Sequence, residues 1–279
     1  MKNISVKLFA ILLMMMSIFC AGCFQVDSDL TIDDDGKVTF KNEVMGVPVM
    51  SEPIEAFKNE LERGHYVTDI TPIASGNMSG YRIITKYDNM EQLAAQDLEI
   101  FNRTNKNKGI QQRKGWFFDA YNFDLLSDAP DDAEEYLNNP IAQSMMPQVK
   151  FNLVINLPYA VETTNAQHIS NDGKTLAWNL TSSVIGGKDI SMQAQFRIWH
   201  KGQIAVTAIA IIALLGGAIY FFKKAKHSSE DKEDAAKNLK YMQICSVLAA
   251  AIISVSTYML IAPVTFTDAD IISKLVSGN

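Results

Sequence analysis

Three long apolar segments divide the chain, and most of its polar residues lie between the first two. The segments are Ile4–Ala21, Ile204–Phe222 and Tyr241–Val264. The middle segment contains no charged residue, no amide side chain and no proline. At about 1.5 Å per residue, a helix of this length can cross a hydrocarbon core of about 30 Å. We therefore predict a transmembrane helix over residues 203–222.

Between the first two segments, apolar and polar residues alternate in several short runs. This alternation is typical of strands that bury one face. Asp35-Gly36 and Asp172-Gly173 each lie between two such runs, where Asp-Gly is a strong signal for a tight turn. The predicted strands are Val26–Ile32, Lys37–Val44, Tyr66–Ile73, Tyr81–Tyr87, Trp116–Leu126, Val149–Leu157, Lys174–Leu180 and Ile190–Trp199.

Apolar residues recur at helical spacing in two further stretches. One predicted helix begins at Ser51 or Glu52 and ends at Gly64, and Asn89 caps a second, Met90–Phe101. Many strands with two or three helices predict an α+β fold with a mainly antiparallel sheet. A C-terminal pair of transmembrane helices completes the predicted fold class.

Lysines beside the apolar segments predict the orientation of the chain in a membrane. Lys223, Lys224 and Lys226 directly follow the middle segment, whereas Lys201 is the only lysine close to its other end. Because cytoplasmic flanks carry an excess of Lys and Arg, residues 223–240 are predicted to be a cytoplasmic loop. Residues 23–200 then form an extracytoplasmic domain.

The third apolar segment is long enough to return across the membrane. We predict a second transmembrane helix over residues 241–264 and a short outer tail over residues 265–279. A cytoplasmic or interfacial second helix is the alternative. Gly216-Gly217 and Ala249–Ala251 offer small-residue faces through which two helices could pack closely.

The amino terminus has the features of an export signal. A basic start precedes the apolar run Leu8–Phe19, which predicts a signal peptide over residues 1–22. The segment Phe19-Cys20-Ala21-Gly22-Cys23 resembles the lipobox of bacterial lipoproteins, with Cys20 in place of the usual aliphatic residue. The resemblance implies cleavage before Cys23 and a diacylglycerol on its thiol. The alternatives are an uncleaved signal anchor and a plain signal peptide cut nearby.

The balance of charge narrows the range of partners. The whole chain has a formal charge of −6, and acidic residues also outnumber basic ones in the predicted outer domain. This excess argues against nucleic acid as a partner. The acidic run Asp33–Asp35 lacks the ligand spacing of a calcium-binding EF-hand loop, so a solvated turn is predicted there.

One basic stretch stands out in this acidic domain. Residues 102–114 form a predicted polar loop, and Trp116 follows it. Basic residues beside aromatic ones could dock on anionic head groups or wall polymer. The alternative, which we favour, is a solvated hairpin loop leading into a strand whose aromatic residues pack inside. The candidate surface-docking residues are Arg103, Lys106, Lys108, Arg113, Lys114 and Trp116.

The predicted outer domain shows no catalytic, metal or cofactor motif. It has no cysteine beyond Cys23 and no Gly-x-Ser-x-Gly sequence, and its histidines are isolated from one another. Clustered His and Cys, which zinc sites require, are missing, as are phosphate- and dinucleotide-binding fingerprints. We therefore predict no catalytic residue, no metal ligand and no cofactor, and we expect that the protein is not an enzyme. The alternative is a glycosidase, whose two carboxylates need no sequence motif, and two or three carboxylates converging in a cleft would favour it.

Two segments of the outer domain resemble the LppM-type domain family of bacterial lipoproteins. They are VDSDLTIDDDGKVTF after Cys23 and FNLVINLPYAVETTNAQHISNDGKTLAWNL later in the chain. The order of lipid cysteine, α+β domain and membrane helix is also similar. The resemblance implies an extracytoplasmic domain associated with envelope lipid or lipoglycan, without known catalysis.

Together these features predict a bacterial cell-membrane protein that is both lipid-anchored and multi-pass. Its outer domain is expected to bind a lipid or lipoglycan ligand, and an apolar cavity between sheet and helices would support that function. The alternative is a structural or assembly factor whose helix pair and outer domain dock a membrane-protein partner.

Overall fold

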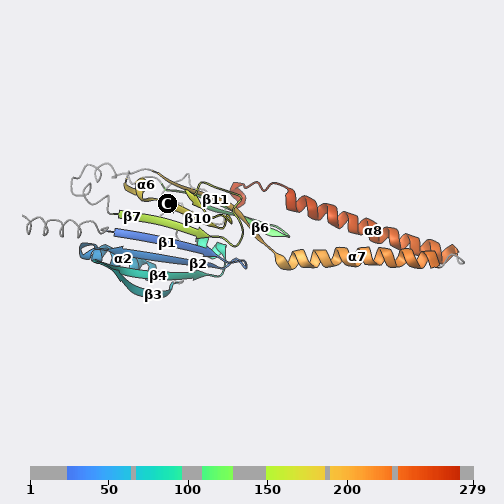
Figure 1. Ribbon diagram of the computed structural model, residues 1–279, viewed down its shortest axis with the longest axis horizontal. Helices are drawn as coiled ribbons and strands as arrows, with labels where there is room; N and C mark the ends of the chain where they lie inside the picture. Colours follow the sequence, from blue (N-terminus) through green and yellow to red (C-terminus); the bar gives the residue numbers. More distant parts are fainter. Residues whose placement is uncertain are drawn as a thin grey trace, which may run out of the picture. The chain divides into compact units, whose positions relative to one another are not determined.

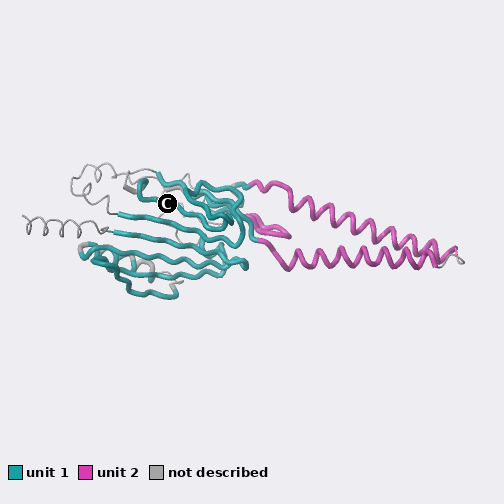
Figure 2. The backbone as a smooth tube through the Cα atoms, in the orientation of Figure 1, with its two compact units in different colours: residues 1–112, 121–198, 266–279 teal, residues 113–120, 199–265 magenta. Residues whose placement is uncertain are grey.

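The computed structural model describes residues 24–63, 67–95, 109–127, 149–185, 189–227 and 232–270. The chain forms two compact units, shown in separate colours in Figure 2. The first unit comprises residues 1–112, 121–198 and 266–279, and the second comprises residues 113–120 and 199–265. The predicted lipidation residue Cys23 and the signal peptide before it lie outside the described residues.

A seven-stranded sheet dominates the first unit, with the strand order β3-β4-β2-β1-β7-β10-β9 (Figure 1). Its neighbouring strands pair antiparallel, except that β1 and β7 are parallel. The strands are β1 (Phe24–Ile32), β2 (Val38–Gly46), β3 (Val67–Ser75), β4 (Met78–Tyr87), β7 (Val149–Asn156), β9 (His168–Ile169) and β10 (Thr175–Asn179).

The other strands form a four-stranded sheet in the order β5-β6-β11-β8. They are β5 (Gly109–Lys114), β6 (Phe118–Ser127), β8 (Thr163–Thr164) and β11 (Ile190–Trp199). The helices are η1 (Pro48–Met50), α2 (Ser51–Arg63), α3 (Met90–Ala95), α6 (Thr181–Ile185), α7 (Lys201–His227), α8 (Lys232–Ile261) and η4 (Asp268–Asp270).

One buried cluster joins the two sheets. Leu176 of the larger sheet and Phe196 of the smaller one are both fully buried in it. The ring of Phe196 stacks on Tyr121 at 5.4 Å and meets Phe123 edge-on at 5.3 Å between centroids. Aromatic contacts of this kind add to the area that each ring buries. The inner face of the larger sheet is therefore apolar.

Helix α2 contacts strands β2 and β4 of the same sheet. Its Ile54 is buried, and its Glu55 carboxylate accepts a hydrogen bond from the Tyr81 hydroxyl on β4. That bond raises the pKa of Tyr81 and lowers the pKa of Glu55. The ammonium of Lys58 lies 5.0 Å from the centre of the Tyr81 ring, within range of a cation–π contact.

The two Asp-Gly turns form as the sequence predicts. Gly36 and Gly173 adopt positive φ angles of 85° and 69°, which glycine reaches without a steric cost. In the first turn, the Lys37 ammonium lies 2.6 Å from the Asp35 carboxylate and lowers its pKa. Both side chains are exposed, so the acidic run is a solvated turn, as expected.

The observed elements confirm the predicted fold class, a mainly antiparallel α+β fold followed by two long apolar helices. Two predictions differ in detail. Residues 109–114 form strand β5 rather than part of a polar loop, and the next strand begins at Phe118 rather than Trp116. Strand β2 ends at Gly46 rather than Val44, and the short helix η1 precedes α2.

Both long helices extend into the charged segment between the two apolar stretches. In the segment predicted to be a cytoplasmic loop, residues 223–240, α7 continues to His227 and α8 begins at Lys232. Hydropathy reports the length of the apolar stretch and not the end of the helix. Glu233 and Asp234 also lie in the first turn of α8, where the helix dipole favours acidic residues.

Candidate functional site

The outer face of the seven-stranded sheet carries a group of polar side chains. Along β1, Asp27 and Asp29 point to this face, while Leu30 and Ile32 contribute to the buried core. The same alternation places Lys41 and Glu43 of β2 on the polar face. Because side chains alternate along a strand, these residues are presented by the same backbone that positions the core. We call this surface the polar face.

Strand register aligns these side chains in two rows. In the first row, Asp27 is paired with Glu43 on one side and with Asn152 on the other. Asn179 of β10 continues that row beside Asn152. In the second row, Asp29 is paired with Lys41 and Val154, followed by Ala177 and His168.

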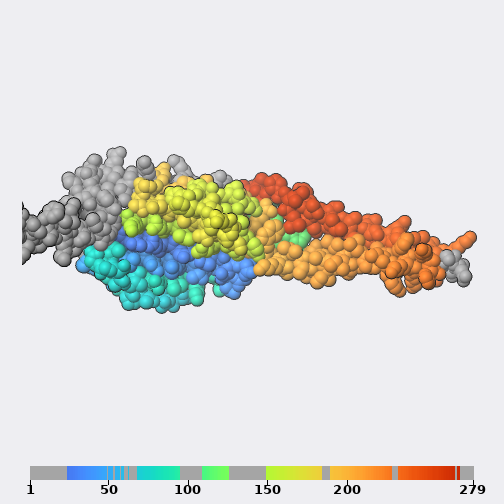
Figure 3. Space-filling view, in the orientation of Figure 1, coloured from blue at the N-terminus to red at the C-terminus, as the bar shows by residue number. Residues whose placement is uncertain are grey.

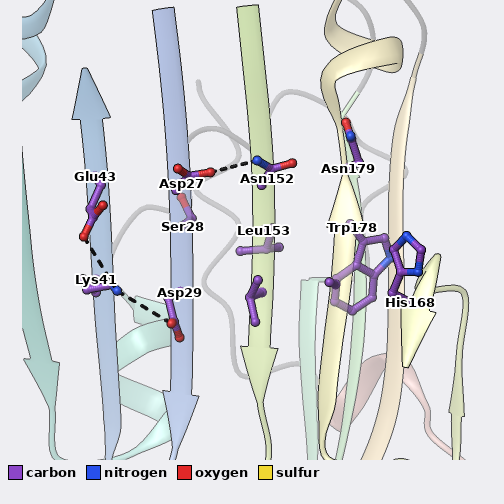
Figure 4. Close-up of a pocket in the computed structure, with 12 residues that line it drawn as sticks. Asp27, Ser28, Asp29, Lys41, Glu43, Asn152, Leu153, His168, Trp178 and Asn179 are labelled. Carbon is purple, nitrogen blue, oxygen red and sulfur yellow. Dashed lines mark hydrogen bonds and ion pairs between the residues drawn. The ribbon is translucent and has the colours of Figure 1, made fainter. Parts of the chain in front are cut away.

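Hydrogen bonds and ion pairs hold the rows in place (Figure 4). The Asn152 amide donates to Asp27 Oδ1 at 2.8 Å, and the Asn156 amide donates to Asp29 Oδ1 at 2.8 Å. Lys41 Nζ lies 3.9 Å from Asp29 Oδ2 and 3.8 Å from Glu43 Oε1. These contacts join three neighbouring strands and orient the carboxylates of Asp27 and Asp29.

The two rows line a hollow of about 410 Å³. Its volume lies within the usual range for small-ligand sites, about 300–1,000 Å³. Carboxylates accept hydrogen bonds, amides both donate and accept them, and the Lys41 ammonium donates. The residues around the hollow are Asp27, Ser28, Asp29, Lys41, Glu43, Asn152, Leu153, Val154, His168, Ala177, Trp178 and Asn179.

A metal role for this hollow has no support among the residues that the structure describes. No group of three or more His, Cys, Asp or Glu side chains is arranged to hold a metal ion in this part of the chain. The carboxylates of the polar face instead have amide, ammonium and guanidinium partners, the last from Arg82 on β4, whose Nε lies 2.7 Å from Glu43 Oε1.

The predicted surface-docking residues fall into two groups. Arg103, Lys106 and Lys108 lie outside the described residues. Arg113 and Lys114 end strand β5, and Trp116 lies in the short turn before β6; all three side chains are exposed. The aromatic residues that follow, Phe117 and Phe118, are buried, as the favoured alternative predicted, but Trp116 is 57% exposed. Trp116 is thus exposed, whereas the two aromatic residues that follow it are buried.

This turn belongs to the second unit together with the two long helices. The Arg113 guanidinium donates to the Thr265 carbonyl at 2.8 Å, after the end of α8. The Trp116 indole Nε1 donates to Thr207 Oγ1 on α7 at 3.3 Å. The backbone N–H of His200, just before α7, donates to the Phe117 carbonyl at 2.8 Å.

Both long helices are apolar around most of their surface and have the length to span a membrane, which indicates membrane association. They pack against each other, and Figure 3 shows α7 in orange beside α8 in red. Small residues lie at the contact: Ala249 is 1% exposed, and a Cβ on Gly217 would stand 3.6 Å from Cys245 Sγ. Gly216 has open space where a Cβ would be. Of the small residues predicted to pack the two helices together, Gly217 lies at the contact with α8 and Ala249 is buried.

Sequence reasoning missed the polar face as a site. The alternation of Asp27, Asp29 and Thr31 with apolar residues predicted a strand but gave no reason to distinguish its polar side from any solvated face. Asn152 lies far from these residues in the sequence, and only the parallel pairing of β1 with β7 makes them neighbours. The isolated histidine His168 belongs to the same hollow for an equally non-local reason.

Comparison with known proteins gives one weak likeness. No family model matches the sequence, and no curated protein matches it. The chain is similar to the NMR structure of the folded domain of Mycobacterium tuberculosis LppM at 15% sequence identity and a TM-score of 0.40. The match covers 66% of this chain and 95% of that chain. The likeness is one of fold alone, so LppM-type family membership stays a prediction.

Proposed function

We propose that the protein is a membrane-anchored bacterial protein whose outer domain binds an envelope lipoglycan through its sugar part. In this proposal α7 and α8 both cross the membrane, with the lysines after Phe222 in the cytoplasm and the sheets outside. A diacylglycerol on Cys23 adds a second attachment to the membrane. A lipid anchor combined with the helices holds the domain stably, whereas a single acyl chain would bind only marginally. The proposed role is binding rather than catalysis.

The observation that carries the ligand proposal is the pre-organised set of polar groups across β2, β1 and β7. Asp27 and Asp29 each accept an amide hydrogen bond at 2.8 Å, and Asp27 accepts a second from the Gln25 amide, yet a carboxylate has about four acceptor positions. The remaining positions can accept from ligand hydroxyl groups. Because the side chains are already oriented, binding costs little additional ordering of the protein.

The chemistry of the hollow favours a sugar over the other candidate ligands. Asp27, Asp29 and Glu43 outnumber Lys41 and Arg82, whose Nε lies 2.7 Å from Glu43 Oε1, so the group keeps an acidic excess that repels an anionic phosphate. An acyl chain would displace water from polar groups without replacing their hydrogen bonds, which is costly. A neutral sugar offers hydroxyl groups that both donate and accept, which matches the carboxylates and amides of the two rows. In this proposal the ligand lies in a hollow on the polar face of the sheet rather than in the expected apolar cavity between sheet and helices.

Binding of the detergent-purified full-length protein to an array of bacterial lipoglycans and wall polysaccharides would test this function. We expect selective binding to a small set of neutral glycans. Asn152→Leu and Asp27→Leu should each weaken it about tenfold or more, because each removes hydrogen bonds to the ligand and to its neighbour. Lys86→Leu, on the same face of β4 but outside the hollow, is the matched control and should bind as the wild type does.

Two results would count against the proposal. Glycan binding that both hollow variants leave unchanged would place the ligand elsewhere. A stoichiometric membrane protein that co-purifies with the full chain, together with no glycan binding, would favour the alternative role as an assembly factor.

A further inference from the structure

Trp116 is an exception among the exposed apolar side chains. In the part of the chain that the structure describes, the exposed large hydrophobic residues lie on α7 and α8, with two exceptions. These are Ile169, 49% exposed, and Trp116, 57% exposed. Trp116 differs from Ile169 in belonging to the same compact unit as the two apolar helices.

The turn that carries Trp116 is hydrogen-bonded near the start of α7 and to the segment after the end of α8. We define the hairpin tip as residues 113–118. It reaches α7 through the Trp116–Thr207 hydrogen bond and the segment before α7 through the His200–Phe117 backbone bond. It reaches the segment after α8 through the bond from Arg113 to Thr265. Three separate contacts therefore set the position of the tip along the helix pair.

The ring of Phe118 further braces the tip. It meets the ring of Trp199, the last residue of β11, in an edge-on arrangement at 5.1 Å. Phe118 is buried, so the tip turns one aromatic residue inward and leaves the other, Trp116, outward. This aromatic contact therefore connects the turn to the strand that leads into α7.

The hydrogen bond to Thr207 shows how far along α7 the Trp116 side chain lies. Thr207 is six residues beyond Lys201, which corresponds to about 9 Å along the α7 axis. It lies after Ile204, the first residue of the uninterrupted apolar stretch. Trp116 thus stands beside the end of α7 where polar sequence gives way to apolar sequence. In membrane proteins this level is the interface between head groups and acyl chains, where Trp is enriched.

We propose that the hairpin tip is an interfacial membrane anchor, with Trp116 inserted at the head-group level of the outer leaflet. This inference rests on the proposed function in one respect, that α7 crosses a membrane. The indole supplies an apolar ring for the upper acyl chains and an N–H that is already bonded to Thr207. Arg113 and Lys114, both exposed, lie three and two positions before Trp116 and can face lipid phosphates.

Fluorescence quenching in lipid vesicles tests this insertion directly. The full-length protein is reconstituted in phosphatidylcholine vesicles whose acyl chains carry bromine either near the head group or near the chain end. Subtracting the emission of a Trp116→Phe variant isolates the Trp116 signal from those of Trp178 and Trp199. We expect a marked loss of the Trp116 signal with shallow bromine and a smaller loss with deep bromine.

A second variant separates this inference from the transmembrane assignment of α7. Ile212 lies in the middle of α7 and is 69% exposed, so Ile212→Trp in the Trp116→Phe background reports on the centre of the bilayer. We expect deep bromine to quench it more strongly than shallow bromine. If deep bromine quenches Ile212→Trp while neither lipid quenches Trp116, the proposed interfacial anchor is wrong and the transmembrane assignment of α7 is supported. If neither position is quenched, both are wrong.

Discussion

The two compact units treat apolar residues in opposite ways. In the first unit, large side chains such as Phe123, Phe196 and Ile83 are buried, and polar residues cover the outside of the sheet. In the second unit, Ile212 and Val247 are 69% and 67% exposed, while the small residue Ala249 is 1% exposed. Large residues lie inside in one unit and outside in the other.

The two units suit different solvents, because the first buries its large apolar side chains and the second exposes them. Burying large apolar side chains stabilises a domain in water, because it removes apolar surface from that solvent. In lipid this driving force is absent between helices, and close packing of small residues takes its place. The exposed surface of α7 and α8 would be a large apolar patch in water, whereas in a bilayer it needs no further cover.

The largest expected effect comes from making the same kind of truncation in both units. Phe196→Ala removes a fully buried ring that contacts Tyr121 and Phe123, and should lower the free energy of unfolding by about 3–5 kcal/mol. Ile209→Ala on α7 removes a side chain that is 66% exposed, and should change it by less than about 0.5 kcal/mol. Unfolding in detergent followed by near-ultraviolet circular dichroism would measure both. Equal losses of unfolding free energy in the two variants would contradict the difference in packing between the two units.

A charge placed on an exposed apolar residue should have a somewhat smaller effect, and only in one unit. Ile212→Lys should disfavour membrane insertion of α7 by about 2.5–3.5 kcal/mol. Ile169→Lys, at an exposed position of the first unit, should change stability by less than about 0.5 kcal/mol. A reporter fused after His227 and translated with microsomes becomes glycosylated only when α7 fails to stop translocation. An Ile212→Lys chain that inserts as well as the wild type would argue against a membrane environment for α7.

The packing of small residues between the helices can be tested with two adjacent glycines. Gly217→Ile adds carbons toward Cys245 Sγ, which already lies 3.6 Å from the Cβ position, and should cost about 1–3 kcal/mol through overpacking. Gly216→Ile has open space and is the matched control, with the same gain in helix propensity. Thermal unfolding of the helical signal in detergent measures the difference. Similar midpoints for the two variants would mean that Gly217 is not at the contact.

The smallest effect is a dependence on pH that concerns the first unit alone. The Ser170 hydroxyl donates to Asp172 at 2.5 Å and holds the pKa of that carboxyl below its ordinary value of 3.8. Because the folded-state pKa is depressed, the stabilisation is present above the unfolded pKa of about 3.9 and is lost as pH falls through the folded one. Asp172→Asn should therefore be less stable than the wild type at pH 7, and the gap should narrow below about pH 4. Urea unfolding measures the free energy of unfolding of both proteins across this pH range. A difference between them that stays constant with pH would contradict the prediction.

Local structure was predictable because its causes are local. Alternation predicted β1, β2 and β11, the Asp-Gly pairs predicted both turns, and Asn89 predicted the start of α3, where its side chain accepts from the Gln92 N–H at 2.8 Å. The two apolar helices were predictable for the same reason. Each of these features depends on residues within a few positions of one another.

The candidate site could not be predicted to the same degree, because it depends on strand pairing between distant segments. Asp27 and Asn152 are neighbours only through the parallel register of β1 and β7. The sequence also presented Trp116, Phe117 and Phe118 as one aromatic run, whereas the structure buries the last two and exposes the first. Hydropathy alone does not distinguish these positions, since the direction of each side chain is set by the turn and by the contacts around it.

We propose that α7 and α8 cross a membrane and hold the sheet domain outside the cell. Cysteines introduced in a Cys245→Ala background test this topology through labelling of intact cells with a membrane-impermeant maleimide, and the Cys245→Ala protein itself measures any label on Cys20 and Cys23. Asn171→Cys, in an exposed turn of the first unit, should label in intact cells, and Lys224→Cys, near the end of α7, should label only after the cells are permeabilised. Labelling of Lys224→Cys but not Asn171→Cys in intact cells would contradict the claim, as would recovery of the protein in the soluble fraction.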